Sequence, residues 1–142
     1  MLNQKLNKII TNLIELKNKQ QDKIRIEITN INKEKTEKLT EIYELEEKIA
    51  TNSQKITLKK TTFYSNVETK IFSHKEVYSL RSDLEKLNLE YNEFNKNYKS
   101  LSNELSKINE KLEDKQKVLK ALIVKEEKFK YINEVLKHST IK

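Results

Sequence analysis

Few side chains in this sequence could carry out catalysis at neutral pH. The only histidines are His74 and His138, and the chain contains no cysteine. Neither histidine belongs to an H-E-x-x-H motif or pairs with a cysteine at zinc-binding spacing. The phosphate-binding loop of nucleotide hydrolases requires glycine, of which there is none. We therefore expect no metal, no cofactor and no enzymatic activity.

Paired carboxylates are the other candidates for acid–base chemistry. Glu41 with Glu44, and Glu110 with Asp114, have helical spacing and could share a proton inside a cleft that excludes water. Without such a cleft they form a solvated helix face, which is the interpretation we favour. The remaining chemistry is that of lysine, because 29 basic residues face 22 acidic ones, for a net charge of +7.

One apolar stripe organises the second half of the chain. Its members recur at steps of three and four residues, which is the heptad spacing of a coiled-coil seam and fits no strand. Lys115 and Glu126 are the two polar interruptions. The stripe consists of Val77, Leu80, Leu84, Leu87, Tyr91, Phe94, Tyr98, Leu101, Leu105, Ile108, Leu112, Leu119, Leu122 and Phe129.

The first half carries a second, less regular stripe. At Gln20 and at Lys35 two steps of four follow one another, which predicts stutters that locally unwind the supercoil and loosen the first helix. The stripe consists of Leu2, Leu6, Ile9, Leu13, Leu16, Ile24, Ile28, Ile31, Leu39, Ile42, Leu45, Ile49 and Ile56.

The chain reverses between the two stripes. Threonine, serine and asparagine, which are mediocre helix formers, accumulate after residue 51. Ser73 and Glu76 then form a capping box, with Phe72 and Val77 placed for a hydrophobic staple. We expect one all-α domain over residues 1–142, with a first helix over about 2–60, a reversal over about 61–72 and a second helix over about 73–139.

Two long helices in an antiparallel coiled-coil hairpin satisfy both stripes. The absence of glycine and proline also favours long uninterrupted helices. A parallel homodimer through the second stripe is the alternative. The hairpin would place three pairs side by side: Leu2 with Leu136, Leu6 with Ile132 and Ile9 with Phe129.

Basic residues gather toward the two ends of the chain, which the hairpin brings together, whereas its middle is acidic. We expect this basic open end to be a docking surface for another protein. The candidate partner-binding residues are Lys5, Lys8, Lys125 and Lys128, together with Tyr131, which lies off the seam.

Two short segments resemble the central-stalk family of type III secretion and flagellar export ATPases. Ser73–Leu80 resembles the cap and first turns of the second helix in that family. Lys125 and Glu126, followed by Phe129 and Ile132, resemble a Lys-Glu pair followed by an aromatic and a large apolar residue. The family has tryptophan where this chain has Ile132.

The resemblance implies a non-enzymatic stalk of a virulence or flagellar protein-transport system. Its open end would enter a hexameric secretion ATPase, its hairpin end would point toward an export-gate protein, and secretion chaperones would be further partners. It would be cytoplasmic, at the cytoplasmic face of the inner-membrane export apparatus.

Three other functions are open to the same sequence. A generic coiled-coil adaptor or chaperone-escort protein would bind a partner helix at the stutters near Gln20 and Lys35. A nucleic-acid binder needs a face of Lys and Arg uninterrupted by acid, whereas glutamates occur along most faces here. No run of about 20 apolar residues exists and Met1–Leu16 has no continuous apolar region. We expect no nucleic-acid partner, no membrane insertion and no signal peptide.

Overall fold

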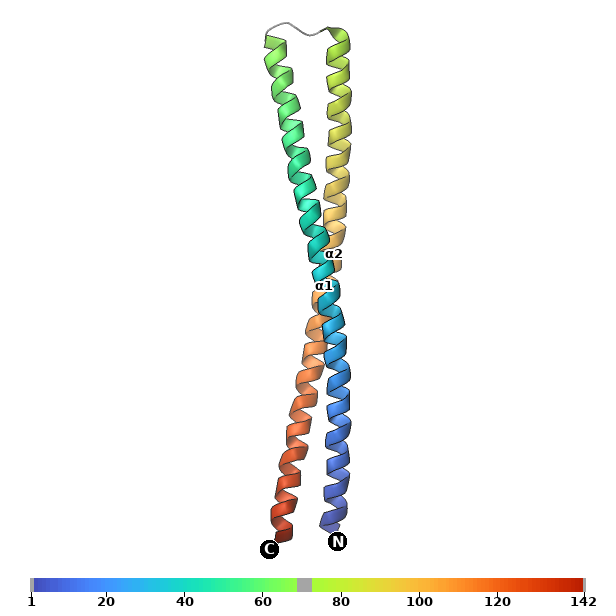
Figure 1. Cartoon of the computed structure of the whole chain (residues 1–142), viewed down its shortest axis with the longest axis vertical. Helices are drawn as coiled ribbons and strands as arrows, with labels where there is room; N and C mark the ends of the chain where they lie inside the picture. The colour runs from blue at the N-terminus through green and yellow to red at the C-terminus, as the bar shows by residue number, and fades with distance from the viewer. Residues whose placement is uncertain (1, 69–72, 142) are drawn as a thin grey trace. The chain divides into compact units, whose positions relative to one another are not determined.

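The protein is an antiparallel helical hairpin. A computed structural model describes residues 2–68 and 73–141, and these contain helix α1 (Leu2–Glu68), helix α2 (His74–Ile141) and no strand. In Figure 1 the two helices run in opposite directions, so that each segment of α1 has a segment of α2 beside it. The expected fold class is confirmed.

Helix α1 continues to Glu68 instead of ending near residue 60. The threonines that suggested an earlier end of this helix have hydrogen-bond partners for their hydroxyl groups within the helix. The hydroxyls of Thr57, Thr61 and Thr62 donate to the carbonyl oxygen four residues earlier, at 3.0, 2.8 and 2.9 Å. A β-branched residue with such a bond has a low cost in a helix. The remainder of the expected reversal, residues 69–72, lies outside the described residues.

Ser73 is the N-cap of α2, as the sequence predicts. Its Oγ accepts a hydrogen bond from the backbone N–H of Glu76 at 3.2 Å. Its carbonyl oxygen accepts the first helical bond, from Val77 at 3.1 Å. The side-chain oxygen thereby satisfies one of the free N–H groups at the helix start. Phe72, the other partner of the expected staple, lies outside the described residues.

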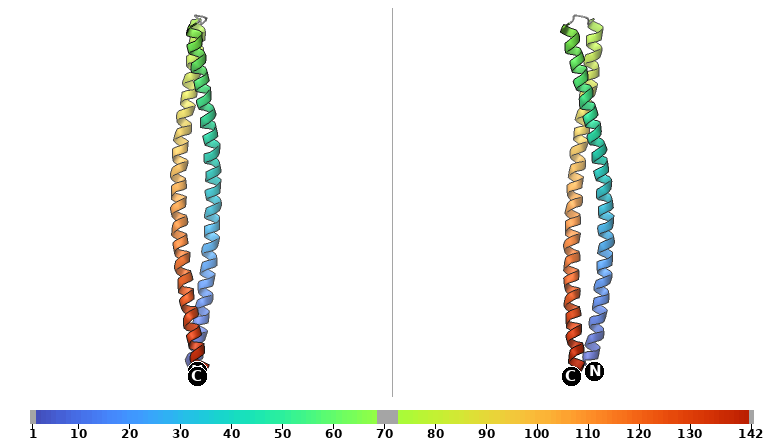
Figure 2. Two further views of the ribbon diagram at one scale, coloured as in Figure 1. Left: turned by 90° about the vertical axis from the view of Figure 1, so that its left-hand side faces the viewer. Right: turned by 60° about the vertical axis from the view of Figure 1, so that its left-hand side comes forward.

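The expected single hairpin contains two compact units. Unit 1 comprises residues 1–35 and 107–142, and unit 2 comprises residues 36–106. Each unit is therefore one segment of α1 packed against one segment of α2. The two further views in Figure 2 show the paired segments side by side within each unit.

The apolar stripe of α2 is the seam that faces α1. Every member from Val77 to Phe129 is buried or half-buried, including the polar positions Lys115 and Glu126. Leu80 is 9% exposed in unit 2, and Ile108 is 4% exposed in unit 1. The heptad interpretation of the second helix is confirmed.

The seam of α1 differs from the predicted stripe. Buried and half-buried residues follow one another at alternating steps of four and three without interruption, so the predicted stutters at Gln20 and Lys35 are wrong. Lys38 lies in the seam, and Leu39, which was expected there, is 41% exposed. The seam consists of Asn3, Asn7, Ile10, Ile14, Lys17, Gln21, Ile24, Ile28, Ile31, Lys35, Lys38, Ile42, Leu45, Ile49, Asn52, Ile56, Lys59, Phe63 and Asn66.

The register of unit 1 also differs from the expected one. Lys115 Nζ lies 2.8 Å from Glu27 Oε2. Leu6 is three heptads before Glu27, and Leu136 is three heptads after Lys115, so Leu6 lies level with Leu136. This partner is one helical turn beyond Ile132, the predicted one. The expected pairs Leu2 with Leu136, Leu6 with Ile132 and Ile9 with Phe129 are therefore wrong. The unbroken heptad fixes which side of α1 faces α2, whereas polar contacts between the helices, such as Lys115 with Glu27 and Gln21 with Glu126, fix their axial alignment.

Replacement of Ile108 by alanine tests the seam of unit 1. Ile108 is 4% exposed, so the change leaves a cavity and should lower the free energy of unfolding by about 2–4 kcal/mol. Ile26 belongs to the same unit but is 63% exposed, and Ile26→Ala should change the free energy of unfolding by less than about 0.5 kcal/mol. Urea unfolding followed by circular dichroism measures both, and equal effects would contradict the seam.

Candidate interaction surface

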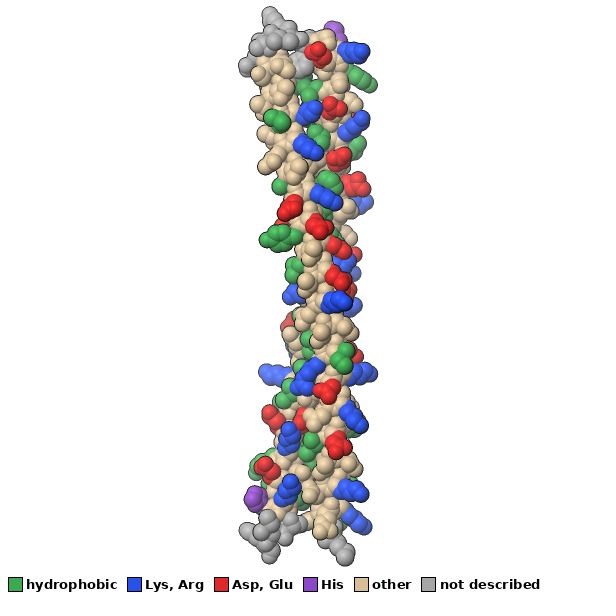
Figure 3. All heavy atoms as spheres, viewed as in Figure 1, with side chains coloured by type: hydrophobic (Ala, Val, Ile, Leu, Met, Phe, Trp, Pro, Cys, Tyr) green, Lys and Arg blue, Asp and Glu red, His purple; other side chains and the backbone are tan. Residues whose placement is uncertain are grey.

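The five residues proposed to bind a partner all lie in unit 1. Lys5, Lys8, Lys125 and Lys128 are exposed, and Tyr131 is 69% exposed. The hairpin thus brings the N-terminal and C-terminal lysines into the same unit. Figure 3 shows basic side chains interspersed with acidic ones along the face of this unit that it presents.

The heptad positions decide how these residues are distributed around unit 1. Seam residues occupy positions a and d, so g and c lie on one flank of the seam, e and b on the other, and f at the back. Two antiparallel helices are related by a twofold axis that runs through the face of the pair. Equivalent positions of α1 and α2 therefore lie on the same face. The predicted residues fall on three sides: Lys125 and Lys128 on the c/g face, Lys8 on the e/b face, and Lys5 and Tyr131 at the back.

The c/g face of unit 1 is mainly apolar over residues 2–20 and 118–135. In α1 its members are spaced by four and three residues, and four of them are exposed by 39–73% of their surface. In α2, Val118, Ile132 and Val135 are 43–49% exposed, and Lys125 and Lys128 interrupt the apolar series. The members over residues 2–20 and 118–135 are Leu2, Leu6, Ile9, Leu13, Leu16, Gln20, Val118, Ala121, Lys125, Lys128, Ile132 and Val135.

The e/b face of unit 1 holds a polar cluster around a buried carboxylate. Glu126 is 7% exposed and accepts a hydrogen bond from Gln21, which is 2% exposed. Lys130 Nζ lies 2.8 Å from Glu126 Oε1. With its amide nitrogen facing the carboxylate, Asn18 lies 2.9 Å from both oxygens. Arg25 in turn donates to Gln21 Oε1 at 3.3 Å. Asn18, Arg25 and Lys130 all occupy e positions, so they reach the seam from the flank opposite the c/g face.

This cluster keeps Glu126 ionised. The hydrogen bond from Lys130 lowers the pKa of Glu126 below its ordinary value of 4.5, and the bond from Gln21 acts in the same direction. Burial opposes them by raising the pKa. The polar layer is thus a fully partnered interruption of an apolar seam, and such layers fix register in coiled coils.

Lysines in the α1 and α2 seams extend their ammonium groups to flanking carboxylates. Lys38 Nζ lies 3.1 Å from Glu104 in unit 2, and the hydrogen bond to Glu104 raises the pKa of Lys38. In unit 1 the bond from Lys115 lowers the pKa of Glu27. The aliphatic stems stay in the seam while the charged ends reach its edge, which is the usual behaviour of half-buried lysine.

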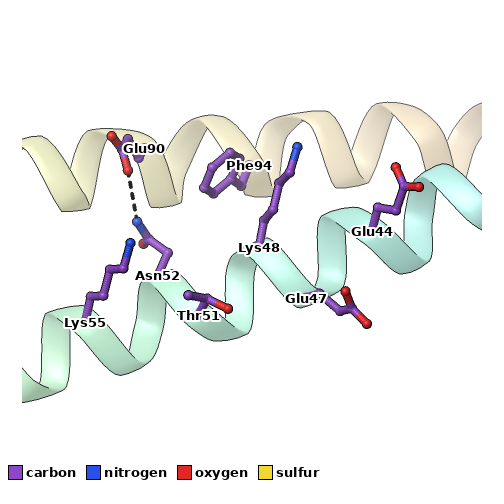
Figure 4. A pocket seen from close by; sticks show the side chains of 8 residues that line it. All are labelled: Glu44, Glu47, Lys48, Thr51, Asn52, Lys55, Glu90 and Phe94. Carbon is purple, nitrogen blue, oxygen red and sulfur yellow. Dashed lines mark hydrogen bonds between the residues drawn. The ribbon is translucent and has the colours of Figure 1, made fainter.

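Unit 2 has an open hollow of about 410 Å³ along its seam. Figure 4 shows it between the α1 turns around Lys48 and Asn52 and the α2 residues Glu90 and Phe94. Asn52 is 4% exposed and donates to Glu90 Oε2 at 3.3 Å. The hollow is a groove beside a buried polar layer, and Asn52 in the seam gives unit 2 its own register-setting residue.

Residues 2–68 and 73–141 contain no group of three histidine or carboxylate side chains that could hold a metal ion. Within the same residues, neither helix has a stretch long and apolar enough to cross a membrane. Comparison of the chain with protein-family models, curated proteins and solved structures finds no match.

The polar cluster was not foreseen from the sequence. From the sequence, Glu126 is an interruption of the α2 stripe and a member of the Lys-Glu pair of the resembling segment, and neither Gln21 nor Asn18 has an assigned role. The sequence does contain a signal for this cluster, because Glu126 and Gln21 both lie at heptad spacing from apolar seam residues. It could be used only with the correct α1 seam, which is offset by one residue from the stripe Leu2–Leu16.

Replacement of Glu126 by glutamine tests the cluster through its pH dependence. Because the pKa of Glu126 is lower in the folded protein, its stabilisation is present above about pH 4.5 and is lost as the pH falls through the folded-state value. At pH 7 the variant should be less stable by about 1–2 kcal/mol, from the lost charged hydrogen bonds. Thermal unfolding at pH 7 and pH 3 should show the difference shrinking at acid pH. A difference that stays constant would exclude this role for Glu126.

Proposed function

We propose that this protein is a non-enzymatic central stalk of a type III secretion or flagellar export ATPase. In this proposal unit 1 enters the lumen of a hexameric ATPase ring, and the chain contacts an export-gate protein and secretion chaperones. Its place would be the cytoplasmic face of the inner-membrane export apparatus.

The observation that carries the proposal is the segregation of charge between the two units. Unit 1 contains 18 Lys and Arg against 10 Asp and Glu, a net charge of +8. Unit 2 contains 11 against 12, a net charge of −1. The surplus positive charge therefore belongs to the unit that holds both ends of the chain. A basic end suits an acidic ring lumen, because complementary charge steers association.

The antiparallel hairpin and the Ser73 cap support the resemblance on which the proposal rests. Of the second resembling segment, Lys125 and Ile132 are exposed, whereas Glu126 and Phe129 lie in the seam. This division leaves Lys125 and Ile132 free for contact with a ring, while Glu126 and Phe129 hold the hairpin together.

Unit 1 presents different chemistry to its different sides, and this suits a stalk inside a symmetric ring. A sixfold ring around an apolar c/g face and a polar e/b face would meet different contacts at different subunits. Differential contact of this kind is the only way in which a bound stalk can favour one subunit conformation over another.

A coiled-coil adaptor or chaperone-escort protein is the second candidate function. The exposed apolar residues of unit 1 favour it, since an adaptor needs a surface for a partner helix. The stutters at which the sequence suggested such binding do not exist, so the c/g face takes their place in this candidate function.

Reversal of four charges tests the stalk proposal. The variant carries glutamate at Lys5, Lys8, Lys125 and Lys128, and the partner is the hexameric secretion ATPase from the same cell. Affinity should fall by more than about tenfold at physiological salt, because attraction is replaced by repulsion. The helices should stay folded, because all four side chains are exposed.

A matched variant separates position from total charge. It carries glutamate at Lys55, Lys60, Lys96 and Lys99, which are exposed residues of unit 2. The affinity of this variant should change by less than about threefold, because these charges would lie outside the ring. Equal losses in both variants, or no loss in the first with unchanged circular dichroism, would reject unit 1 as the docking end.

A further inference from the structure

The apolar side chains of unit 1 are unevenly divided between its seam and its surface. Four of the six α1 seam positions from Asn3 to Gln21 are polar. Four of the six c/g positions from Leu2 to Gln20 are leucine, and a fifth is Ile9. The more apolar stripe of this segment therefore lies beside the seam, on the exposed c/g face. Leu2 is 73% exposed and Ile9 54%.

This exposed stripe has the spacing of a second coiled-coil seam. Leu2, Leu6, Ile9, Leu13 and Leu16 are separated by steps of four and three, which form the holes that receive the side chains of another helix. Val118, Ile132 and Val135 of α2 border the same face. The stripe from Leu2 to Leu16 extends over about 21 Å at 1.5 Å per residue, which is the length of about four helical turns.

The c/g face is positively charged over this segment, and it contains no acidic residue that could pair with its lysines. Lys125 and Lys128 are its only charged residues over positions 2–20 and 118–135. The acidic residues nearest in sequence are Glu126 and Glu127; the first faces the seam and the second lies on the e/b face. A ligand that covers the apolar stripes must therefore supply acidic groups beside Lys125 and Lys128.

We propose that the c/g face of unit 1 binds one acidic amphipathic helix of another protein. The apolar stripe of that helix packs between Leu6, Ile9 and Ile132, and its glutamate or aspartate residues pair with Lys125 and Lys128. This inference goes beyond the stalk proposal and does not rest on it, because any partner with such a helix would fit.

A second copy of this chain is a poorer occupant of the face. The register of unit 1 places Lys125 and Lys128 level with the α1 residues around Leu16. Face-to-face packing of two copies would set these lysines against Leu13 and Leu16 or against each other. Burial of an unpaired ammonium group costs far more than the apolar contact around it returns.

A lipid surface also fits the face less well than a helix does. Lipid-facing helices present a wide apolar surface with a dense basic border. Here the two apolar stripes are narrow and follow the heptad spacing that matches side chains of another helix.

A synthetic peptide of about four heptads provides the probe, with leucine at a and d and glutamate at e and g. The glutamates repel one another, which opposes self-association of the peptide. Fluorescence anisotropy with the full chain should show saturable binding. A peptide with lysine in place of every glutamate should bind at least about tenfold more weakly, because two attractions become repulsions.

Matched triple variants locate the peptide. Replacement of Leu6, Ile9 and Ile132 by serine should weaken binding by more than about a hundredfold. Replacement of Ile26, Val124 and Tyr131 by serine removes exposed apolar residues of the same unit at f positions and should leave affinity unchanged within about threefold.

A pair of spin labels distinguishes docking of the peptide on the c/g face from insertion of the peptide between α1 and α2. The chain has no cysteine, so Lys19→Cys and Lys117→Cys give one spin-label pair across unit 1. The distance between the labels should not change when the peptide binds. A changed distance would show that the peptide displaces a helix and would overturn the proposal.

Three further results would overturn it. They are equal affinity for the acidic and basic peptides, equal losses in the two triple variants, and a concentration-dependent dimer that dissociates in the Leu6, Ile9 and Ile132 variant. Binding of anionic phosphatidylserine vesicles without binding of the peptide would assign the face to a membrane instead.

Discussion

The continuous heptad is the constraint on which both units depend. A seam that repeats every 3.5 residues keeps the same side of each helix against its partner only if no residue is added or removed. From Ile24 onward, isoleucine, leucine and phenylalanine fix the phase of the α1 seam. The first five turns of α1 follow the same phase, although it places Asn3, Asn7 and Lys17 in the seam and leucines beside it.

Several of the charged residues in the seam have partners within their own unit. Glu126 is surrounded by Gln21, Asn18 and Lys130, and Lys115 reaches Glu27. Ion pairs and amide layers of this kind add little net stability compared with leucine, but they penalise other registers strongly. The hairpin thus combines a modest apolar core with a well-defined alignment.

The sequence predicted the fold well and the α1 face poorly. In α2, the long regular stripe from Val77 to Phe129 left a single phase, and every position in it lies in the seam. In α1, two stripes offset by one residue compete, and the choice of Leu2, Leu6 and Ile9 followed local hydrophobicity. The structure follows the phase of the whole helix, which local composition does not reveal. The prediction that the first helix ends near residue 60 is wrong for a related reason. The helix propensity of threonine does not take into account the hydrogen bonds that the hydroxyls of Thr57, Thr61 and Thr62 donate within the helix.

The weak α1 seam between Asn3 and Gln21 also links ligand binding to the integrity of unit 1. Helix pairs separate most readily where few apolar groups are enclosed, so local opening should be most frequent at this end of the chain. A ligand that recognises both helices at once can bind only while they are together, and its binding free energy is added to that of the closed pair. Occupancy and closure of the pair would then rise and fall together, so the exposed leucines would make this end responsive to whatever covers them.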